Sequence, residues 1–265
     1  MNESMSDLIQ LNRLDSGVVE LVINRPEALN ALNIAVLLGL KTALEKLASD
    51  QTVRVIVLRG AGEKALAAGA DIREMQTMGR SDAAQFSRLG HSVCLLLESM
   101  PKVTVAAVQG FALGGGTELA LACDFILASE KAQFGLPEVG LGVIPGFGGT
   151  IRLARAVGLT RAKELVFSGE RFGSAEAAQL GLIRKVLPQD GFFDEVRKQA
   201  AKIARNSLPA VWAAKGLMNE FEESSGVYPK VDAEIHRFSS LFGTPDQKEG
   251  MGAFSEKRAA KFVGL

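Results

Sequence analysis

Two glutamates in this sequence lie beside unusually dense groups of glycine. Glu118 comes two residues after the glycine triplet 114–116 and is followed by the apolar residues 119–122, whereas Glu138 follows a proline and precedes further glycines. A carboxylate inside an apolar helix is unfavourable unless it has a partner or faces a cleft. Successive glycines let a backbone approach a ligand closely, and N–H groups at the start of a helix favour negative charge. The pattern indicates a ligand site that combines backbone donors with carboxylates.

Three segments carry this combination, namely residues 64–71, 110–118 and 134–146. Each follows or flanks a predicted strand. Taken singly, a glycine triplet also fits a tight turn or close helix packing, and Glu138 also fits a solvated loop acid. Asp71, at the end of the first segment, is typical of a helix N-cap. The functional interpretation therefore depends on the three segments together.

Other common catalytic patterns are absent from the sequence. It contains no G-x-x-x-x-G-K-[ST] phosphate loop and no G-x-S-x-G nucleophile motif, and Pro145 interrupts the only glycine cluster that could resemble a dinucleotide fingerprint. Cys94 and Cys123 cannot form a disulfide framework, and two histidines, His91 and His236, exclude a three-histidine metal site. We therefore predict no metal ion and no nucleotide cofactor.

Composition restricts the class of protein further. The chain has 265 residues, 47% of them hydrophobic and 23% charged, with Lys plus Arg and Asp plus Glu both at 30. Zero net charge argues against a general nucleic-acid binder. The N-terminus lacks the apolar core of a secretory signal, and no run of about 18 apolar residues occurs. We expect a cytoplasmic protein that binds neither nucleic acid nor membrane.

The periodicity of apolar residues predicts an α/β fold with parallel strands. Short apolar runs predict strands at 18–23, 53–58, 103–108 and 125–128, and helical spacing predicts helices at 37–47, 80–99 and 117–123. Beyond residue 148 the pattern is mostly helical, at 149–157, 160–167, 174–180, 191–205, 208–223, 227–242 and 245–260. We predict an α/β core over 1–190 and a helical C-terminal region over 191–265.

Short motifs, each a weak signal by itself, follow one another in order along nearly the whole chain. They are Asn24-Arg25-Pro26, Leu29-Asn30-Ala31-Leu32, Ala67 to Asp71, Gly110 to Glu118, Phe134 to Glu138, Ile144-Pro145-Gly146, Gly148-Gly149-Thr150, Glu249-Gly250-Met251, Ala253-Phe254 and Glu256-Lys257-Arg258. Together they resemble the crotonase superfamily, and most of all its enoyl-CoA hydratases. The resemblance implies a spiral of ββα turns and C-terminal helices that mediate a homotrimer or a homohexamer.

The resemblance also implies an activity, the reversible syn addition of water to a trans-2-enoyl-CoA to give a 3-hydroxyacyl-CoA. It assigns the N–H groups of Ala70 and Gly115 to an oxyanion hole for the thioester oxygen. Glu118 would hold and deprotonate the water, and Glu138 would handle the α-proton. Coenzyme A would enter as part of the substrate, with no separate cofactor. The remaining implied substrate contacts are Ala28, Ala68, Asp71, Ile72, Arg73 and Lys257.

Alternatives within and outside this chemistry stay open at the level of sequence. A Δ3–Δ2 enoyl-CoA isomerase or another crotonase-type acyl-CoA lyase uses the same scaffold, and isomerases of the superfamily typically keep one acid, at the position of Glu138. RNA binding is less consistent with the zero net charge. A scaffold without activity is less consistent with the presence of both Glu118 and Glu138. Leu66, Leu136 and Phe147 depart from residues common in relatives, which leaves the acyl chain undetermined.

Overall fold

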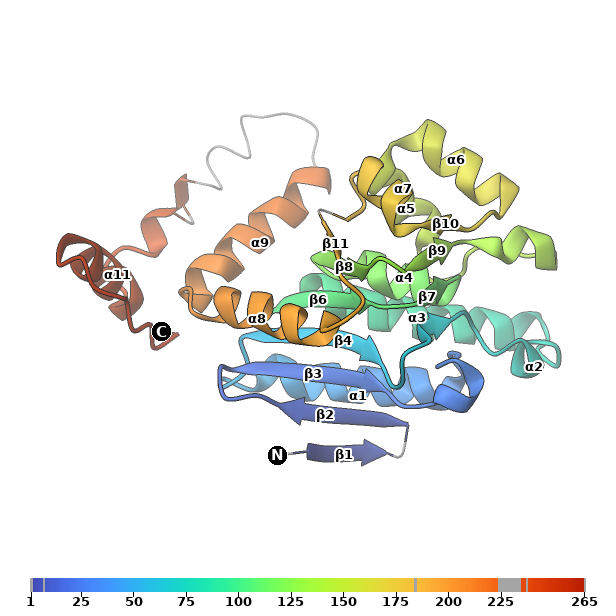
Figure 1. Cartoon of the computed structure of the whole chain (residues 1–265), viewed down its shortest axis with the longest axis horizontal. Helices are drawn as coiled ribbons and strands as arrows, with labels where there is room; N and C mark the ends of the chain where they lie inside the picture. The colour runs from blue at the N-terminus through green and yellow to red at the C-terminus, as the bar shows by residue number, and fades with distance from the viewer. Residues whose placement is uncertain (1, 7, 184, 224–234, 237, 265) are drawn as a thin grey trace.

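The structure is a computed structural model that describes residues 2–6, 8–183, 185–223, 235–236 and 238–264. In this part of the chain, one sheet has the strand order β1-β2-β3-β4-β6-β8-β11 (Figure 1). From β3 onwards its neighbouring strands are parallel, while β1 and β2 are antiparallel additions at one edge. The bounds are β1 (Asn2–Ser6), β2 (Ile9–Arg13), β3 (Val18–Ile23), β4 (Val55–Gly60), β6 (Val103–Val108), β8 (Phe125–Ser129) and β11 (Val186–Leu187).

A second, smaller sheet has the order β10-β9-β7-β5 and consists of very short strands. These are β5 (Ala65–Ala68), β7 (Phe111–Leu113), β9 (Gln133–Gly135) and β10 (Phe172–Gly173). Along the chain, β4 and β5, β6 and β7, and β8 and β9 each give one strand to each sheet before the next helix begins. This repeated order is the spiral of ββα turns that the resemblance implied.

Helices cover the sheets and continue beyond them towards the C-terminus (Figure 1). They are η1 (Pro26–Ala28), α1 (Ile34–Ser49), α2 (Ile72–Met75), α3 (Arg80–Ser99), α4 (Gly115–Ala122), η2 (Pro137–Leu141), α5 (Gly149–Val157), α6 (Leu159–Ser168), α7 (Ser174–Gln179), α8 (Phe192–Ala204), α9 (Leu208–Glu223) and α11 (Pro245–Ser255). None of the helices in the described part combines the length and the apolar character needed to cross a bilayer.

The large sheet is buried on both faces, which explains why its strands read as continuous apolar runs. In β4, Ile56 and Leu58 belong to the main hydrophobic core with α1 and α3, whereas Val55 and Val57 pack in a second cluster with α8. Alternate residues of one strand thus point into different cores. A strand of this kind shows no polar face in the sequence.

The structure confirms the predicted strands and nearly all the predicted helices, with small differences at their ends. The last predicted helix, 245–260, ends at Ser255 as α11. The predicted helix 227–242 lies mostly outside the described residues. The division at residue 190 stays a prediction, although helices α8, α9 and α11 do follow that point.

Helix α9 is attached to the α/β core by a buried lysine. Lys215 is 9% exposed, and its Nζ donates to the carbonyl oxygens of Leu97 and Lys102 at 3.1 and 3.0 Å. The same Nζ lies 3.0 Å from Asp124 Oδ1. Asp124 in turn accepts a 2.8 Å hydrogen bond from the N–H of Thr104. This ion pair joins α9 to the ends of α3 and α4 and to the start of β6.

We predict that Lys215→Met lowers the free energy of unfolding by about 2 kcal/mol, because it removes the donor from the carbonyl oxygens of Leu97 and Lys102 and the cation from Asp124. Urea denaturation followed by circular dichroism measures the change. Lys198→Ala is the matched control, since Lys198 is 79% exposed and pairs with Glu195 only at 3.5 Å. Equal, small effects of the two substitutions would contradict this account of α9.

Candidate active site

Two backbone loops meet at the ends of the short strands β5 and β7. Gly114, which precedes α4, has φ +50°, and a Cβ built on it would lie 3.6 Å from the Cα of Gly69. The residues that follow these two glycines are Ala70 and Gly115. Among the described residues, neither the N–H of Ala70 nor that of Gly115 has a hydrogen-bond acceptor. The pair therefore offers two free donors beside each other, as an oxyanion hole requires.

The first loop, which carries Gly69 and Ala70, is supported by hydrogen bonds from the segment around Asn30. Leu29 and Asn30 both have positive φ, 52° and 58°, a conformation that asparagine tolerates better than most residues. The buried Asn30 amide donates to the carbonyl oxygens of Ala61 and Ala65. The backbone of this segment then pairs with the loop, through the N–H of Ala68 and the carbonyl oxygen of Leu29 at 3.0 Å. These contacts fix the loop that carries Ala70.

The second loop is fixed by close packing at the start of α4. A Cβ on Gly116 would lie 2.0 Å from the carbonyl oxygen of Ala67, so only glycine allows α4 to approach β5 this closely. The hydroxyl of Thr117 lies 2.5 Å from the carbonyl oxygen of Ala112 and accepts from the N–H of Gly135 at 3.2 Å. Strands β7 and β9 are thereby tied to the helix that carries Glu118.

Glu118 is 1% exposed, and its carboxyl group is held by backbone donors. Its Oε1 accepts from the N–H groups of Phe147 and Gly149, both at 2.7 Å. Gly149 is the first residue of α5, so the positive end of that helix faces the carboxylate. Burial raises the pKa of Glu118, while these N–H groups and the charge of Arg152 act in the opposite direction. The carboxyl group is therefore buried, with its pKa raised above the usual value and one oxygen held by two N–H donors.

Glu138 approaches the same place from η2. A Cβ on Gly114 would lie 2.5 Å from Glu138 Oε1, which places this carboxyl group directly against the second loop. Its Oε2 is buried and has no hydrogen-bond partner in the described part of the chain. Burial, with a contribution from the charge of Glu118, raises the pKa of Glu138 to about 7. The two predicted acids therefore interact, and one oxygen of Glu138 is left without a hydrogen-bond donor among the described residues.

Most of the predicted substrate contacts lie around the first loop. Ala68 ends β5, Ala28 ends η1, and Asp71, Ile72 and Arg73 lead into α2. Asp71 caps α2 by accepting from the N–H of Arg73 at 3.1 Å, as its sequence position predicted. Ile72 is 45% exposed. The roles of these residues in substrate binding stay predictions.

Lys257 is the predicted contact that the fold does not bring to this site. It follows α11, and Figure 1 shows α11 at the opposite end of the molecule from α2. A contact between Lys257 and a ligand at the first loop would need a second copy of the chain.

Several contacts of the site were not predicted from the sequence, although Arg25, Phe147 and Gly149 belong to segments that it singled out. Arg25 Nη1 pairs with Asp71 Oδ2 at 2.7 Å and holds the pKa of that carboxyl group below its usual range. Phe147 and Gly149 supply the donors for Glu118, and Arg152 donates to the carbonyl oxygen of Phe147. The glycine cluster preceding Arg152 was the available signal, since a helix that starts there presents its N–H groups to a carboxylate.

Two of the departures from common residues, Phe147 and Leu136, pack next to the residues that hold Glu118. Phe147 is 3% exposed, and its ring lies over Gly90, where a Cβ would come within 2.1 Å of it. The Cδ1 of Leu136 would lie 3.1 Å from a Cβ on Gly149. Phe147 therefore fills a gap beside α3, and Leu136 packs against the residue that binds Glu118.

The two cysteines are buried, and Cys94 Sγ lies 3.9 Å from the carbonyl oxygen of Glu118. Cys94 is fully buried in the core, and burial raises the pKa of its thiol to about 12. Burial likewise raises the pKa of Cys123. Within the described residues, no group of three or more His, Cys, Asp or Glu side chains is arranged to hold a metal ion.

Comparison with known proteins is consistent with this geometry. The family model described as enoyl-CoA hydratase/isomerase matches residues 13–264. The chain is 44% identical over 243 residues to a crotonyl-CoA hydratase of Syntrophomonas wolfei, covering 92% of this chain and 93% of that one. It is 42% identical over 248 residues to a short-chain-enoyl-CoA hydratase of Clostridium acetobutylicum, with coverage of 92% and 93%.

A solved structure agrees over the full fold. The crystal structure of an enoyl-CoA hydratase from Bacillus anthracis superimposes with a TM-score of 0.94 at 36% identity, and covers 97% of this chain and 100% of that one. With the family match over most of its length, the chain belongs to the enoyl-CoA hydratase/isomerase family.

Proposed function

We propose that this protein is an enoyl-CoA hydratase, a hydro-lyase that reversibly adds water across the double bond of a trans-2-enoyl-CoA in the syn sense. One observation carries the proposal: Glu138, whose carboxyl group interacts with that of Glu118, packs against the Gly114 loop, where the N–H groups of Ala70 and Gly115 have no acceptor among the described residues. Relatives that are 42–44% identical over 92% of this chain are named as hydratases of crotonyl-CoA and of short-chain enoyl-CoA.

The free N–H groups of Ala70 and Gly115 would bind the thioester oxygen. Addition of water at Cβ gives negative charge on that oxygen, as an enolate, before Cα is protonated. Donors fixed in advance stabilise this charge where it develops, and the loss of one such donor costs roughly 3 kcal/mol. The fixed backbone of both loops supports this role, because the donors need no rearrangement during the reaction.

The two glutamates would divide the acid–base work. Glu118 holds the water and removes its proton, and Glu138 delivers a proton to Cα. A pKa of about 7 keeps Glu138 protonated in a large fraction of molecules near neutral pH, and its Oε2 is not engaged by any donor in the described part of the chain. The roles are reversed for dehydration. Because the carboxyl groups interact, their protons belong to the pair rather than to either residue alone.

Coenzyme A enters this proposal as part of the substrate, and no separate cofactor takes part. Ala28, Ala68, Asp71, Ile72 and Arg73 lie on or next to the first loop and are the proposed contacts along the CoA portion. The cytoplasmic location that the sequence suggested remains a prediction.

We predict that Glu118→Gln and Glu138→Gln each lower kcat for hydration of crotonyl-CoA by about 10²- to 10⁴-fold, the range for loss of general acid–base catalysis. Loss of the conjugated enoyl-thioester absorbance measures the rate. Glu45→Gln is the matched control, since Glu45 is exposed and pairs with Lys41 on the surface of α1.

Two results would contradict the assignment. A wild-type protein that leaves crotonyl-CoA and longer enoyl-CoA substrates unchanged excludes the hydratase. Full activity of Glu118→Gln towards a 3-enoyl-CoA, measured as isomerisation, supports the isomerase that needs only Glu138.

The pH profile provides an independent measurement. Hydration requires protonated Glu138, whose pKa is raised to about 7, so kcat/KM should be retained below pH 7 and lost as the pH rises above it. Hydration also requires ionised Glu118, so activity should fall again at low pH as that group gains a proton. Stopped-flow rates in buffers of constant ionic strength test this bell shape. A flat profile between pH 5 and 9 would be inconsistent with it.

We also propose that the protein assembles as a homotrimer or homohexamer through its C-terminal helices. Large apolar side chains are exposed on this region, including Trp212 (53%), Met218 (71%) and Phe238 (63%). Light scattering coupled to size-exclusion chromatography should give three or six times the chain mass of 28.1 kDa. A monomer at micromolar concentration would refute the assembly.

A further inference from the structure

The turn that binds Glu118 is anchored on its far side. Two of its peptide groups point N–H groups at Glu118 Oε1, those of Phe147 and Gly149. The carbonyl oxygen of Gly146, which belongs to the same peptide as the Phe147 N–H, accepts from Ser87 Oγ of α3 at 2.6 Å. One donor peptide is therefore held at both ends, by α3 on one side and by the glutamate on the other.

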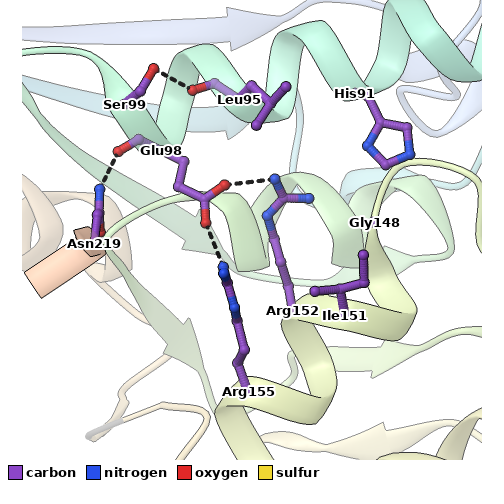
Figure 2. Close-up of a pocket in the computed structure, with 9 residues that line it drawn as sticks. All are labelled: His91, Leu95, Glu98, Ser99, Gly148, Ile151, Arg152, Arg155 and Asn219. Atoms are coloured by element: carbon purple, nitrogen blue, oxygen red, sulfur yellow. Dashed lines mark hydrogen bonds and ion pairs between the residues drawn. The ribbon is translucent and has the colours of Figure 1, made fainter. Parts of the chain in front are cut away.

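The next peptide is anchored by an arginine. Arg152 Nη1 donates to the carbonyl oxygen of Phe147 at 2.9 Å, and Nη2 donates to Glu98 Oε2 at 2.7 Å. Figure 2 shows Arg152 and Arg155 reaching from α5 towards the carboxylate of Glu98 on α3. Arg152 is 7% exposed. It thus fixes the Phe147–Gly148 peptide, which lies between the two donor peptides, and links it to Glu98 on α3.

The backbone is shaped to admit this side chain. Gly148 has φ +101°, and a Cβ on it would lie 2.2 Å from Arg152 Nη1. A planar guanidinium can donate to a carbonyl oxygen and a carboxylate from two different nitrogens, in a geometry that one ammonium does not reproduce. The glycine and the arginine therefore depend on each other.

We propose that Arg152 is a positioning residue for the hydration reaction: it holds the Phe147–Gly148 peptide so that the flanking N–H groups keep Glu118 Oε1 in place. Arg152 has no part in binding substrate in this proposal. It acts through Glu118. The kinetic tests of this role rest on the proposed hydratase function, whereas the hydrogen-exchange test does not.

Replacing Arg152 by alanine should separate positioning from binding. We expect Arg152→Ala to lower kcat for crotonyl-CoA by about 100-fold, the effect of misplacing a catalytic group by about 1 Å, with KM changed by less than about threefold. Arg155→Ala is the matched control, because it removes an equal charge from the same carboxylate, Glu98 Oε1, at 3.0 Å. We expect its kcat to stay within about threefold of wild type.

Chemical rescue provides the sharper measurement. A cavity of about 300 Å³, lined by His91, Glu98, Arg152 and Asn219 among others, borders the guanidinium (Figure 2). Guanidinium added at concentrations well below those that unfold the protein should enter the space left in Arg152→Ala and restore kcat by about tenfold. Sodium chloride at equal ionic strength should not. The wild-type enzyme should respond to neither salt.

A second variant and a second readout keep the inference testable if Arg152→Ala does not fold. Glu98→Gln weakens the anchor of Arg152 and should lower kcat by about tenfold with little change in KM. Amide hydrogen exchange at Phe147 and Gly149 should be faster than wild type in either variant, and this holds even if wild type does not hydrate crotonyl-CoA.

The inference is overturned by an unchanged kcat in folded Arg152→Ala, by an equal loss in Arg155→Ala, by a rise in KM alone, or by a kcat loss that guanidinium does not restore. Exchange at Phe147 and Gly149 that is as slow as in wild type also overturns it. An inert wild type with fast exchange in Arg152→Ala would instead refute the hydratase and leave the positioning role standing.

Discussion

Glu118 places an ionisable carboxyl group in the protein interior, where its charged form needs donors in place of water. Two backbone N–H groups at the start of α5 provide them. This requirement determines the glycines around the site, since a Cβ at Gly149 would lie 2.9 Å from Glu118 Cγ. It also determines the position of α5 relative to α4. Much of the local structure therefore follows from keeping one carboxylate buried and ionisable.

The spiral explains how distant segments reach this carboxylate. Each turn places a short strand of the second sheet beside the previous one, in the order β5, β7 and β9. The chain leaves these strands at the same edge, because the three are parallel. Ala70, Gly115 and Glu138 follow β5, β7 and β9 in turn. Three segments that are dozens of residues apart thus supply one donor, a second donor and an acid to one place.

The sequence predicted the long elements and the chemistry-bearing residues, but not how they meet. Strands such as β6 and helices such as α3 are long enough for apolar spacing to reveal them, with bounds close to those observed. The second sheet could not be predicted from pattern, because strands of three residues such as Phe111–Leu113 contain too little periodicity. It entered only through the resemblance. Glu118 stood out as an acid in an apolar helix.

Arg152 and Ser87 could not have been identified in the same way. Their functional contacts are to backbone carbonyl oxygens, which carry no side-chain signal. A buried arginine in a helix looks like any surface arginine until the fold shows which face it occupies. The same limit applied to Lys257, whose separation from the first loop follows only from the position of α11 in the fold (Figure 1).

The burial of both thiols has a consequence for the handling of the proposed substrate. A conjugated enoyl thioester is an electrophile, and a thiolate adds to its β-carbon without any catalyst. Reaction requires an accessible, deprotonated sulfur. Cys94 and Cys123 are enclosed by the core, and burial raises the pKa of both thiols, that of Cys94 to about 12. Neither thiol of the chain is therefore exposed to alkylation by such a compound.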